Sequence, residues 1–163
     1  MKIGVLVLYL RKGKILLCKK WTGAKIGANK WNSYGGELEV GEDSADAGVR
    51  ETHEESNWGL NVKKRHLVPK GEITFYDWQN TALWFVYLFT CTEFEGEPLE
   101  SEEMKTPTWF SPAEIPTLDM LPADKIFIPM LIAGDEIRDG WVRFSKDMTA
   151  VEDYHLPTTL IAV

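Results

Sequence analysis

Three glutamates, Glu51, Glu54 and Glu55, stand close enough together in the sequence to act on a single ligand. On a helix these positions fall within an arc of about 100°, so the three carboxylates share one side. Carboxylates at this separation repel each other and hold protons unless a cation lies between them. Hard oxygen ligands select Mg²⁺ or Mn²⁺, and Mg²⁺ suits an open face that holds the phosphates of a substrate. The spacing therefore indicates a divalent metal site.

The alternative interpretation of these glutamates is a solvated helix face whose charge serves solubility. The opposite side of the helix carries small side chains that can lie close against a sheet: Ala45, Gly48, Val49 and Thr52. We therefore expect the glutamates to project away from the packing surface as a fixed cluster. The three residues alone do not decide between the two interpretations.

The net charge of −7 comes from one stretch of the chain. Residues 37–55 contain eight acidic side chains and one arginine, whereas the rest of the chain carries equal numbers of acidic and basic residues. Without a basic run, the chain lacks the long-range attraction that nucleic acid polymers and anionic membranes require. A small phosphorylated ligand is still compatible with this charge, because a metal ion can mediate its binding.

The two cysteines and the N-terminus predict a cytoplasmic protein. Cys18 and Cys91 lie inside the apolar runs KILLCKK and FVYLFTCTE, as reduced core cysteines do. The N-terminal run IGVLVLYL has eight residues, too few to cross a bilayer, and no small-residue cleavage site follows it.

The first half of the chain predicts a hairpin, a loop and a helix. Ile3 to Leu10 and Lys14 to Lys19 have the pattern of two strands joined by a charged turn with glycine, and residues 21–33 have the composition of a loop. Gly41 to Asn57 is the best helix candidate, with Asp43 as its N-terminal cap and Gly59 at its end. This helix would carry the three glutamates.

The second half predicts mostly strands, and the mixture indicates one α+β domain over residues 1–163. The predicted elements are strands over Gly71 to Tyr76, Ala82 to Phe89 and Thr108 to Phe110, a short helix capped by Ser111, Pro112 and Glu114, a second helix from about Ala123 to Ile132 bent at Pro129, and an extended tail from Trp141. The run ALWFVYLF is apolar enough to be buried on both faces of a sheet.

Residues 36–58, called the box below, resemble a known family. From Gly36 the chain has five residues, Glu42, seven residues, Arg50 and Glu51, two residues, then Glu54 and Glu55. This spacing resembles the Nudix box, GX5EX7REUXEEXGU, at its six charged or glycine positions. The departures are Thr52 at an aliphatic position, and Asn57 and Trp58 where glycine and an aliphatic residue are expected, with Gly59 and Leu60 following directly. Packing and helix termination depend on these positions, whereas every charged position is kept.

The resemblance continues outside the box. WNSYGGELEVGE before the helix, and EGEPLESEEM with TPTWFSPAEIPTLDMLPADKIFIPM after it, are similar to MutT-type Nudix proteins that hydrolyse oxidised purine nucleoside triphosphates. The similarity covers Lys14 to about Met130, and more loosely extends to Asp153. It implies the Nudix fold, a mixed β-sheet sandwiched between helices, in which the box forms a loop, helix, loop unit.

The resemblance also implies a role for each matched residue. The metal ligands of the family correspond to Glu51, Glu54, Glu55, the carbonyl of Gly35 and a carboxylate in ESEEM. For this carboxylate, Glu103 is the match and Glu102 the alternative. Arg50 and Glu42 would form the ion pair that fixes the helix against the preceding loop. The implied reaction is attack of metal-activated water on the triphosphate, with Glu54 or Glu103 removing the proton. Lys20 matches a lysine near the phosphates, and a solvated lysine is the alternative.

The residues that would bind the base match the family less closely than the metal ligands do. Asn32 matches a base-reading asparagine, and Gly36, Leu121 and Asp124 complete the implied substrate-binding set. The family segment Trp-Pro-Asp-Asp is LPAD here, so a stacking tryptophan and one of two paired acids are absent, and Ile26 replaces another aromatic residue. Asp124 has a second interpretation as a helix cap. The aromatic residues considered for stacking are Trp31, Trp58, Trp78 and Tyr34.

Two other functions stay open at this point. One is hydrolysis of other nucleoside diphosphate compounds, such as undamaged triphosphates, dinucleoside polyphosphates or nucleotide sugars. The other is a non-catalytic nucleotide sensor, which would have no need for all three helix glutamates. The sequence leaves open whether the protein is a monomer or a dimer.

Overall fold

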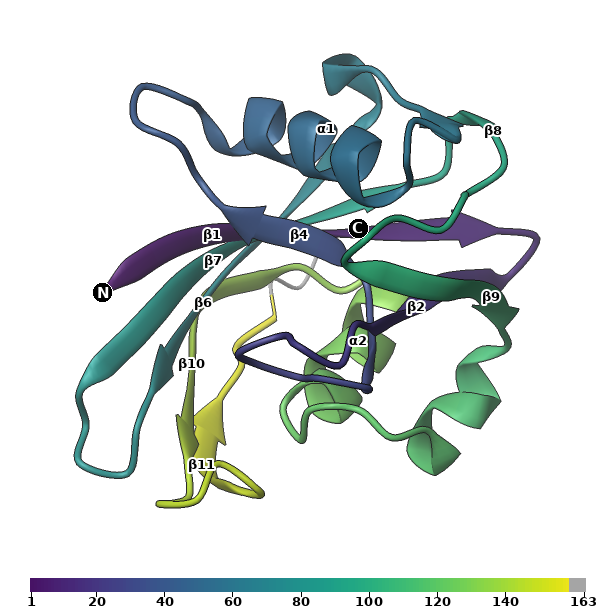
Figure 1. Cartoon of the computed structure of the whole chain (residues 1–163). Coiled ribbons are helices and arrows are strands. Elements are labelled where there is room, and N and C mark those ends of the chain that lie inside the picture. The colour runs from purple at the N-terminus through teal and green to yellow at the C-terminus, as the bar shows by residue number, and fades with distance from the viewer. Residues whose placement is uncertain (159–163) are drawn as a thin grey trace.

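The computed structural model describes residues 1–158, which contain a large mixed sheet with a helix on each side (Figure 1). The strands are β1 (Lys2–Arg11), β2 (Lys14–Lys20), β3 (Trp31–Asn32), β4 (Tyr34–Glu37), β5 (Leu60–Asn61), β6 (Val68–Tyr76), β7 (Ala82–Cys91), β8 (Glu95–Gly96), β9 (Met104–Phe110), β10 (Ile137–Phe144) and β11 (Val151–His155). The α-helices are α1 (Ser44–Glu55) and α2 (Asp124–Ile132), and 3₁₀ helices cover Lys64–His66 and Pro112–Thr117.

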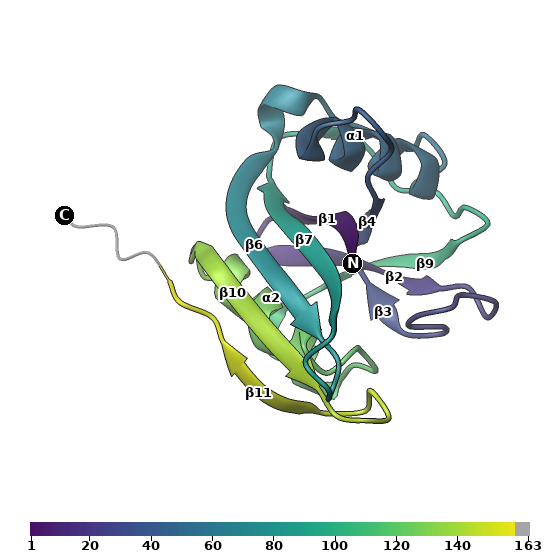
Figure 2. The same cartoon turned by 90° about the vertical axis from the view of Figure 1, so that its left-hand side faces the viewer.

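Nine strands form the main sheet in the order β11-β10-β6-β7-β1-β2-β3, with β4 paired to β1 and β9 paired to β2. The β1–β7 and β10–β6 pairs are parallel and the other pairs are antiparallel. Figure 2 shows β10 and β11 continuing the sheet beyond β6, with α2 behind them. The predicted hairpin between β1 and β2 is confirmed, and its turn residues Lys12 and Gly13 have positive φ, as a tight hairpin turn requires.

The two helices cover opposite faces of the sheet, which confirms the predicted α+β sandwich. On the α1 face, Val5, Val7 and Tyr9 of β1 pack in one buried cluster with Ala47. On the α2 face, Leu8 of β1 belongs to a second cluster with Phe127. Alternate residues of β1 therefore hold the two layers together. Among residues 1–158, neither helix is long and apolar enough to cross a membrane.

Helix α1 is shorter than expected at both ends. Asp43 caps it as predicted, because its carboxylate accepts from the N–H of Asp46 at 2.8 Å. Gly59 does not end it: the helix ends at Glu55, Ser56 is its C-terminal cap, and Asn57 and Trp58 take positive φ values of 50° and 60°. Gly59 is instead a packing glycine, since a Cβ there would lie 2.2 Å from the carbonyl oxygen of Glu97.

The small face of α1 packs on the sheet as predicted. A Cβ on Gly48 would lie 3.0 Å from side-chain carbons of Val7 and Leu67, so the helix approaches β1 closely. Thr52 is fully buried, and its hydroxyl is 2.6 Å from the hydroxyl of Tyr9. This contact fixes the rotation of the helix and therefore the direction of its glutamates.

The second half of the chain confirms most of the expected elements. Glu114 accepts from the N–H of Ser111 at 2.7 Å, one half of the predicted capping box, although the helix that follows is a 3₁₀ helix. The extended tail forms β10 and β11, and β10 begins at Ile137, before the expected start. The prediction that ALWFVYLF is buried on both faces is wrong for its first six residues. Residues 82–87 are half-buried because the β6–β7 hairpin extends beyond both helices (Figure 1).

Candidate functional site

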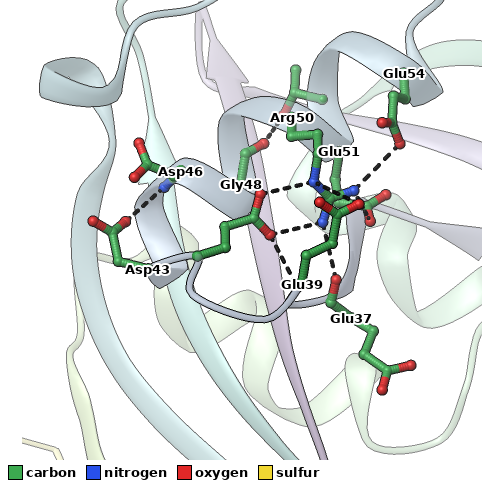
Figure 3. Close-up of polar contacts among 10 residues, drawn as sticks. Glu37, Glu39, Asp43, Asp46, Gly48, Arg50, Glu51 and Glu54 are labelled. Carbon is green, nitrogen blue, oxygen red and sulfur yellow. Dashed lines mark hydrogen bonds and ion pairs between the residues drawn. The ribbon is translucent and has the colours of Figure 1, made fainter.

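Arg50 is the centre of the polar network in the box (Figure 3). Its Nε and Nη2 donate to the two oxygens of Glu42 at 2.8 and 2.9 Å, and Nη2 also donates to the carbonyl of Glu37 at 3.1 Å. Glu42 in turn accepts from the N–H of Glu39 at 3.0 Å. The hydrogen bonds from Arg50 hold the pKa of Glu42 below its usual range. The predicted ion pair is thus present, and it ties α1 to the loop that precedes it.

The remaining arginine nitrogen lies between two of the three helix glutamates. Nη1 of Arg50 donates to Glu51 at 2.9 Å and to Glu54 at 3.4 Å (Figure 3). The Glu54 side chain is 55% exposed, whereas that of Glu51 is 14% exposed. Residues 1–158 contain no group of three His, Cys, Asp or Glu side chains placed to hold a metal ion.

Glu55 does not project away from the packing surface, so this part of the expectation is wrong. The residue is 5% exposed, and its carboxylate accepts from the N–H of Gly35 on β4 at 2.8 Å. Burial raises the pKa of Glu55 well above its usual range, and the neighbouring charge of Glu51 raises it further. The end of α1 therefore turns toward the sheet, where it meets the backbone of β4.

Glu51 lies against Gly36, the first residue of the box. A Cβ on Gly36 would be 2.4 Å from Oε1 of Glu51, so a side chain at this position would displace this carboxylate. Burial raises the pKa of Glu51 to about 7, although its bonds to Arg50 act in the opposite direction. The negative charges of Glu54 and Glu103 raise this pKa further. These carboxylates are therefore close enough to act on one another.

The loop before β9 carries both Glu102 and Glu103. The charge of Glu103 raises the pKa values of both Glu51 and Glu55. Its carbonyl accepts from the N–H of Trp21 at 2.9 Å, so this loop is bonded to the end of β2. Glu102 lines a cavity of about 430 Å³ together with Lys20 and Lys105.

Lys20 lies between the box and the start of α2. Its positive charge lowers the pKa values of both Glu55 and Asp124. A Cβ on Gly27 would lie 3.4 Å from Cδ of Lys20 and 3.7 Å from Cδ1 of Leu121. The loop after β2 therefore brings the lysine and the LPAD segment together.

Asp124 is a buried carboxyl rather than a helix cap. The position before α2 is held by Ala123, without a side-chain cap, and Asp124 is 7% exposed. Burial raises the pKa of Asp124 to about 7, against the attraction of Lys20. In the described part of the chain no hydrogen-bond donor is recorded on its carboxylate, so this carboxyl is available to a ligand.

The oxygen of the Asn32 side-chain amide already accepts a hydrogen bond within the protein. Its Oδ1 accepts from the N–H of Ser33 at 2.8 Å, which fixes the side chain. The NH₂ group is the part left to face a ligand, so Asn32 would act as a donor.

The aromatic residues considered for stacking pack in other places. Trp31 and Tyr34 lie in the two buried clusters, against Phe110 and Tyr9 respectively, Trp58 stacks on His53, and Trp78 lies near Lys146. Sequence reasoning missed a different residue, Trp84, which reaches the backbone of Gly4 beside the box. Its position inside ALWFVYLF gave no signal, because any strand core has such a composition.

The donor set of the box fits a hard divalent cation. All its side-chain donors are carboxylates, and Glu51 and Glu55 are buried near one another at a cost in electrostatic energy that a cation would offset. Glu54 is the exposed member, so it can turn from Arg50 toward its neighbours without unpacking the helix. The resulting arrangement could hold a metal ion and the phosphates bound to it.

Comparison with known proteins identifies relatives over most of the chain. The model of the NUDIX domain family matches residues 1–131. An oxidized purine nucleoside triphosphate hydrolase of Danio rerio is 39% identical over 151 residues, which cover 93% of this chain and 92% of the relative. The protein of the same name from Mus musculus is 38% identical over 131 residues, 80% of each chain.

Solved structures show the same architecture. A MutT protein from Bacillus halodurans superimposes with a TM-score of 0.79 at 25% sequence identity, covering 96% of this chain and 97% of the other. A MutT protein from Aliivibrio salmonicida or Vibrio cholerae, at 20% identity and a TM-score of 0.63, shares the fold. The similarity therefore includes β10 and β11 as well as the box.

Proposed function

Because this chain belongs to the Nudix family, we propose that it hydrolyses oxidised purine nucleoside triphosphates to the monophosphate and pyrophosphate with Mg²⁺, or Mn²⁺, as cofactor. Two relatives at 38–39% identity are named for this activity. The observation that carries the proposal is the burial of Glu51 and Glu55 against the backbone of β4. A solvated helix face would not bury two of its carboxylates.

The metal ligands in this proposal are those of the box and the loop before β9. They are Glu51, Glu54, Glu55, Glu103 and the carbonyl oxygen of Gly35. The effect of Glu103 on the pKa values of Glu51 and Glu55 favours it over Glu102. Arg50 would position the set, since it binds Glu42, Glu51 and Glu54 at once.

A bound Mg²⁺ would screen the phosphate charge and lower the pKa of an attacking water. The chain must then supply a base that removes a proton from this water. Glu54 is the first candidate, because its side chain is 55% exposed and can reach solvent. Glu103 is the second candidate. Lys20, close to Glu55, would offset negative charge on the phosphates.

The base would be read at the start of α2. Asn32 offers its NH₂ group, and Asp124 offers a carboxyl without a recorded protein donor. Together they match a purine edge that presents both an acceptor and N–H donors. Gly36 and Leu121 would border the same site, Gly36 through its contact with Glu51 and Leu121 through its contact with Gly27.

The single-domain assignment of residues 1–163 and a cytoplasmic location are further proposals. Strand β10 pairs with β6 in the middle of the sheet, which supports one domain beyond the end of the family match. Cys18 and Cys91 are buried free thiols, as a reducing compartment favours.

A substrate panel tests the proposed function. We expect pyrophosphate release from 8-oxo-dGTP or 2-oxo-dATP with Mg²⁺, none without it, and a lower kcat/KM for dGTP. The LPAD segment lacks the second acid, so ADP-ribose and O6-methyl-dGTP belong in the panel as substrates of a broader hydrolase. A kcat/KM on these compounds equal to or higher than that on 8-oxo-dGTP would favour the alternative function, hydrolysis of other nucleoside diphosphate compounds. Nucleotide binding without any turnover would favour a sensor and contradict the proposal.

A further inference from the structure

Trp84 lies on β7, in a part of this strand that is paired with β1 on one side and with β6 on the other. It lies opposite Lys2 of the parallel strand β1 and opposite Phe75 of the antiparallel strand β6. Val86 and Leu88, two and four residues further along β7, belong to the cluster under α2. Since side chains alternate along a strand, Trp84 faces the α2 side of the sheet as well.

The indole crosses β1 at a glycine. A Cβ on Gly4 would lie 3.1 Å from Cζ3 of Trp84 and 3.1 Å from the carbonyl oxygen of Gly36. The ring therefore lies against the bare backbone of β1 and extends toward β4, where the box begins. A side chain at position 4 would separate the ring from Gly36, so the glycine is what allows this approach.

The start of α2 lies across the sheet surface from the side where Trp84 approaches the box. The ring of Phe75, opposite Trp84 on the sheet, lies 6.2 Å from that of Phe127. Asp124 is one helical turn before Phe127 and is buried, and Leu121 precedes the helix. Trp84 thus lies on the sheet surface that faces the first turns of α2, while its far edge approaches the box.

We infer that Trp84 provides the aromatic surface on which the purine base stacks. Leu121 occupies the position where the resemblance predicts a stacking tryptophan, so the LPAD segment offers only an aliphatic contact. A base that bonds to Asp124 while its phosphates reach Glu51 and Glu55 must pass the surface between α2 and Gly36. Trp84 lies on that surface. The aromatic partner of the base is therefore on the sheet instead of on the segment that leads into α2.

This inference rests on the proposed function, because it assigns one residue of the same substrate site. It also differs from a purely structural role for Trp84. The Nζ of Lys2 lies 5.4 Å from the indole ring, and this cation–π contact together with packing on Gly4 would explain a half-buried tryptophan without any ligand. A structural role predicts a loss of stability on substitution, whereas stacking predicts a loss of affinity for the base.

The test compares Trp84→Leu with Trp84→Phe and with Trp78→Leu. Trp78 is 42% exposed in the turn between β6 and β7, with the Nζ of Lys146 5.3 Å from its ring, so its replacement removes a tryptophan outside the proposed site and is the matched control. For Trp84→Leu we expect KM for 8-oxo-dGTP to rise about ten- to a hundredfold, with kcat changed much less. Trp84→Phe should keep most of the affinity, and Trp78→Leu should match the wild type.

A second measurement uses binding without metal or turnover. Addition of 8-oxo-dGMP in EDTA should quench the tryptophan fluorescence of the wild type and of Trp78→Leu, and this quenching should be absent in Trp84→Leu. The double variant Trp84→Leu with Leu121→Trp should recover both quenching and a lower KM, since it moves the aromatic surface to the other border. Thermal unfolding of each variant shows whether it is folded.

The outcomes separate the inference from the proposed function. If the wild type hydrolyses 8-oxo-dGTP but folded Trp84→Leu keeps the wild-type KM and quenching, the stacking role is overturned. A loss of kcat and stability with unchanged KM would also overturn it, in favour of a structural role. If the wild type shows quenching that depends on Trp84 but hydrolyses no nucleotide of the panel, the proposed function fails and the stacking role stands.

Discussion

The phosphate end and the base end of the proposed site are held by different forces. At the phosphate end, Arg50 binds three carboxylates and a carbonyl within residues 37–54, and a backbone N–H binds Glu55. At the base end, Asp124 is buried with only the more distant charge of Lys20 to offset it. One end is a polar network that fixes its own geometry. The other depends on packing.

This difference bears on which end can change without loss of the fold. A buried network loses several hydrogen bonds at once when its central residue is replaced. A carboxyl with few polar partners can be exchanged for a neutral residue at little cost, or with a gain. We therefore expect the phosphate end to tolerate few substitutions and the base end to vary, as the change to LPAD already indicates.

The largest effect is expected for Glu54→Gln at the phosphate end. Glutamine keeps the shape of the side chain but cannot accept a proton from water, so kcat should fall by a factor on the order of a hundred or more. Steady-state release of pyrophosphate measures the change. Glu95→Gln, a substitution on the exposed strand β8, is the control and should keep the wild-type rate. Wild-type turnover in Glu54→Gln would remove this residue from the catalytic machinery.

Arg50→Lys tests whether the network sets the geometry. A lysine cannot reproduce the paired bonds to Glu42 and the bonds to Glu51 and the Glu37 carbonyl. We expect the free energy of unfolding, measured with urea, to fall by about 1.5–3 kcal/mol. Arg138→Lys replaces an arginine that is 48% exposed and should change it by less than about 0.5 kcal/mol. Equal effects of the two substitutions would mean that the network adds no special stability.

The sequence was informative about the phosphate end because its signals are local. The cap at Asp43, the small face of α1 and the pair of Arg50 with Glu42 depend on residues less than ten positions apart, and all three are confirmed. The inward turn of Glu55 was missed, since it depends on how the end of α1 meets Gly35 of β4, twenty residues earlier. Helical angles describe which side a residue faces, not what the sheet places there.

At the base end the resemblance implied Asn32, Leu121 and Asp124, whereas nothing in the sequence indicated Trp84. These four residues lie on separate elements, so their assembly into the proposed site depends on the order of the strands and the packing of α2. A tryptophan in an apolar strand and an acid at a helix start both have ordinary structural interpretations. The glycine that lets Trp84 lie against β1 has no meaning until the β1–β7 register is known.

Because Asp124 at the base end is buried, the stability of the protein should depend on pH. The raised pKa of Asp124, about 7, means that the folded protein holds a proton which the unfolded chain releases from about pH 4 upward. The stability that Asp124 contributes is therefore complete at low pH and is lost as the pH rises to about 7. Relative to Asp124→Asn, the wild type should lose at most about 1.4 kcal/mol of unfolding free energy per pH unit in this window.

The comparison of wild type with Asp124→Asn isolates this residue, because the other titrating groups are common to both proteins. Asp119→Asn is the matched control: its bond to Lys30 holds the pKa of Asp119 below the usual range, so the wild type should gain stability over that variant as the pH rises. Urea denaturation at several pH values between 2 and 8 measures both, with the Asp119 change expected below about pH 5 and the Asp124 change between about pH 4 and 7. A constant difference between wild type and Asp124→Asn across this range would mean that Asp124 is not buried as described.

The smallest effect is expected where the box departs from its family pattern. Asn57 takes a φ of 50°, a left-handed conformation in which glycine is unstrained and alanine is not. We expect Asn57→Ala to lower the free energy of unfolding by about 1 kcal/mol and Asn57→Gly to leave it unchanged or raise it slightly. Neither should alter kcat, because this residue ends the helix and carries no charge of the phosphate end. If Asn57→Gly changed kcat, helix termination and metal-site geometry would be coupled, and the fixed network around Arg50 would not be sufficient to place the glutamates.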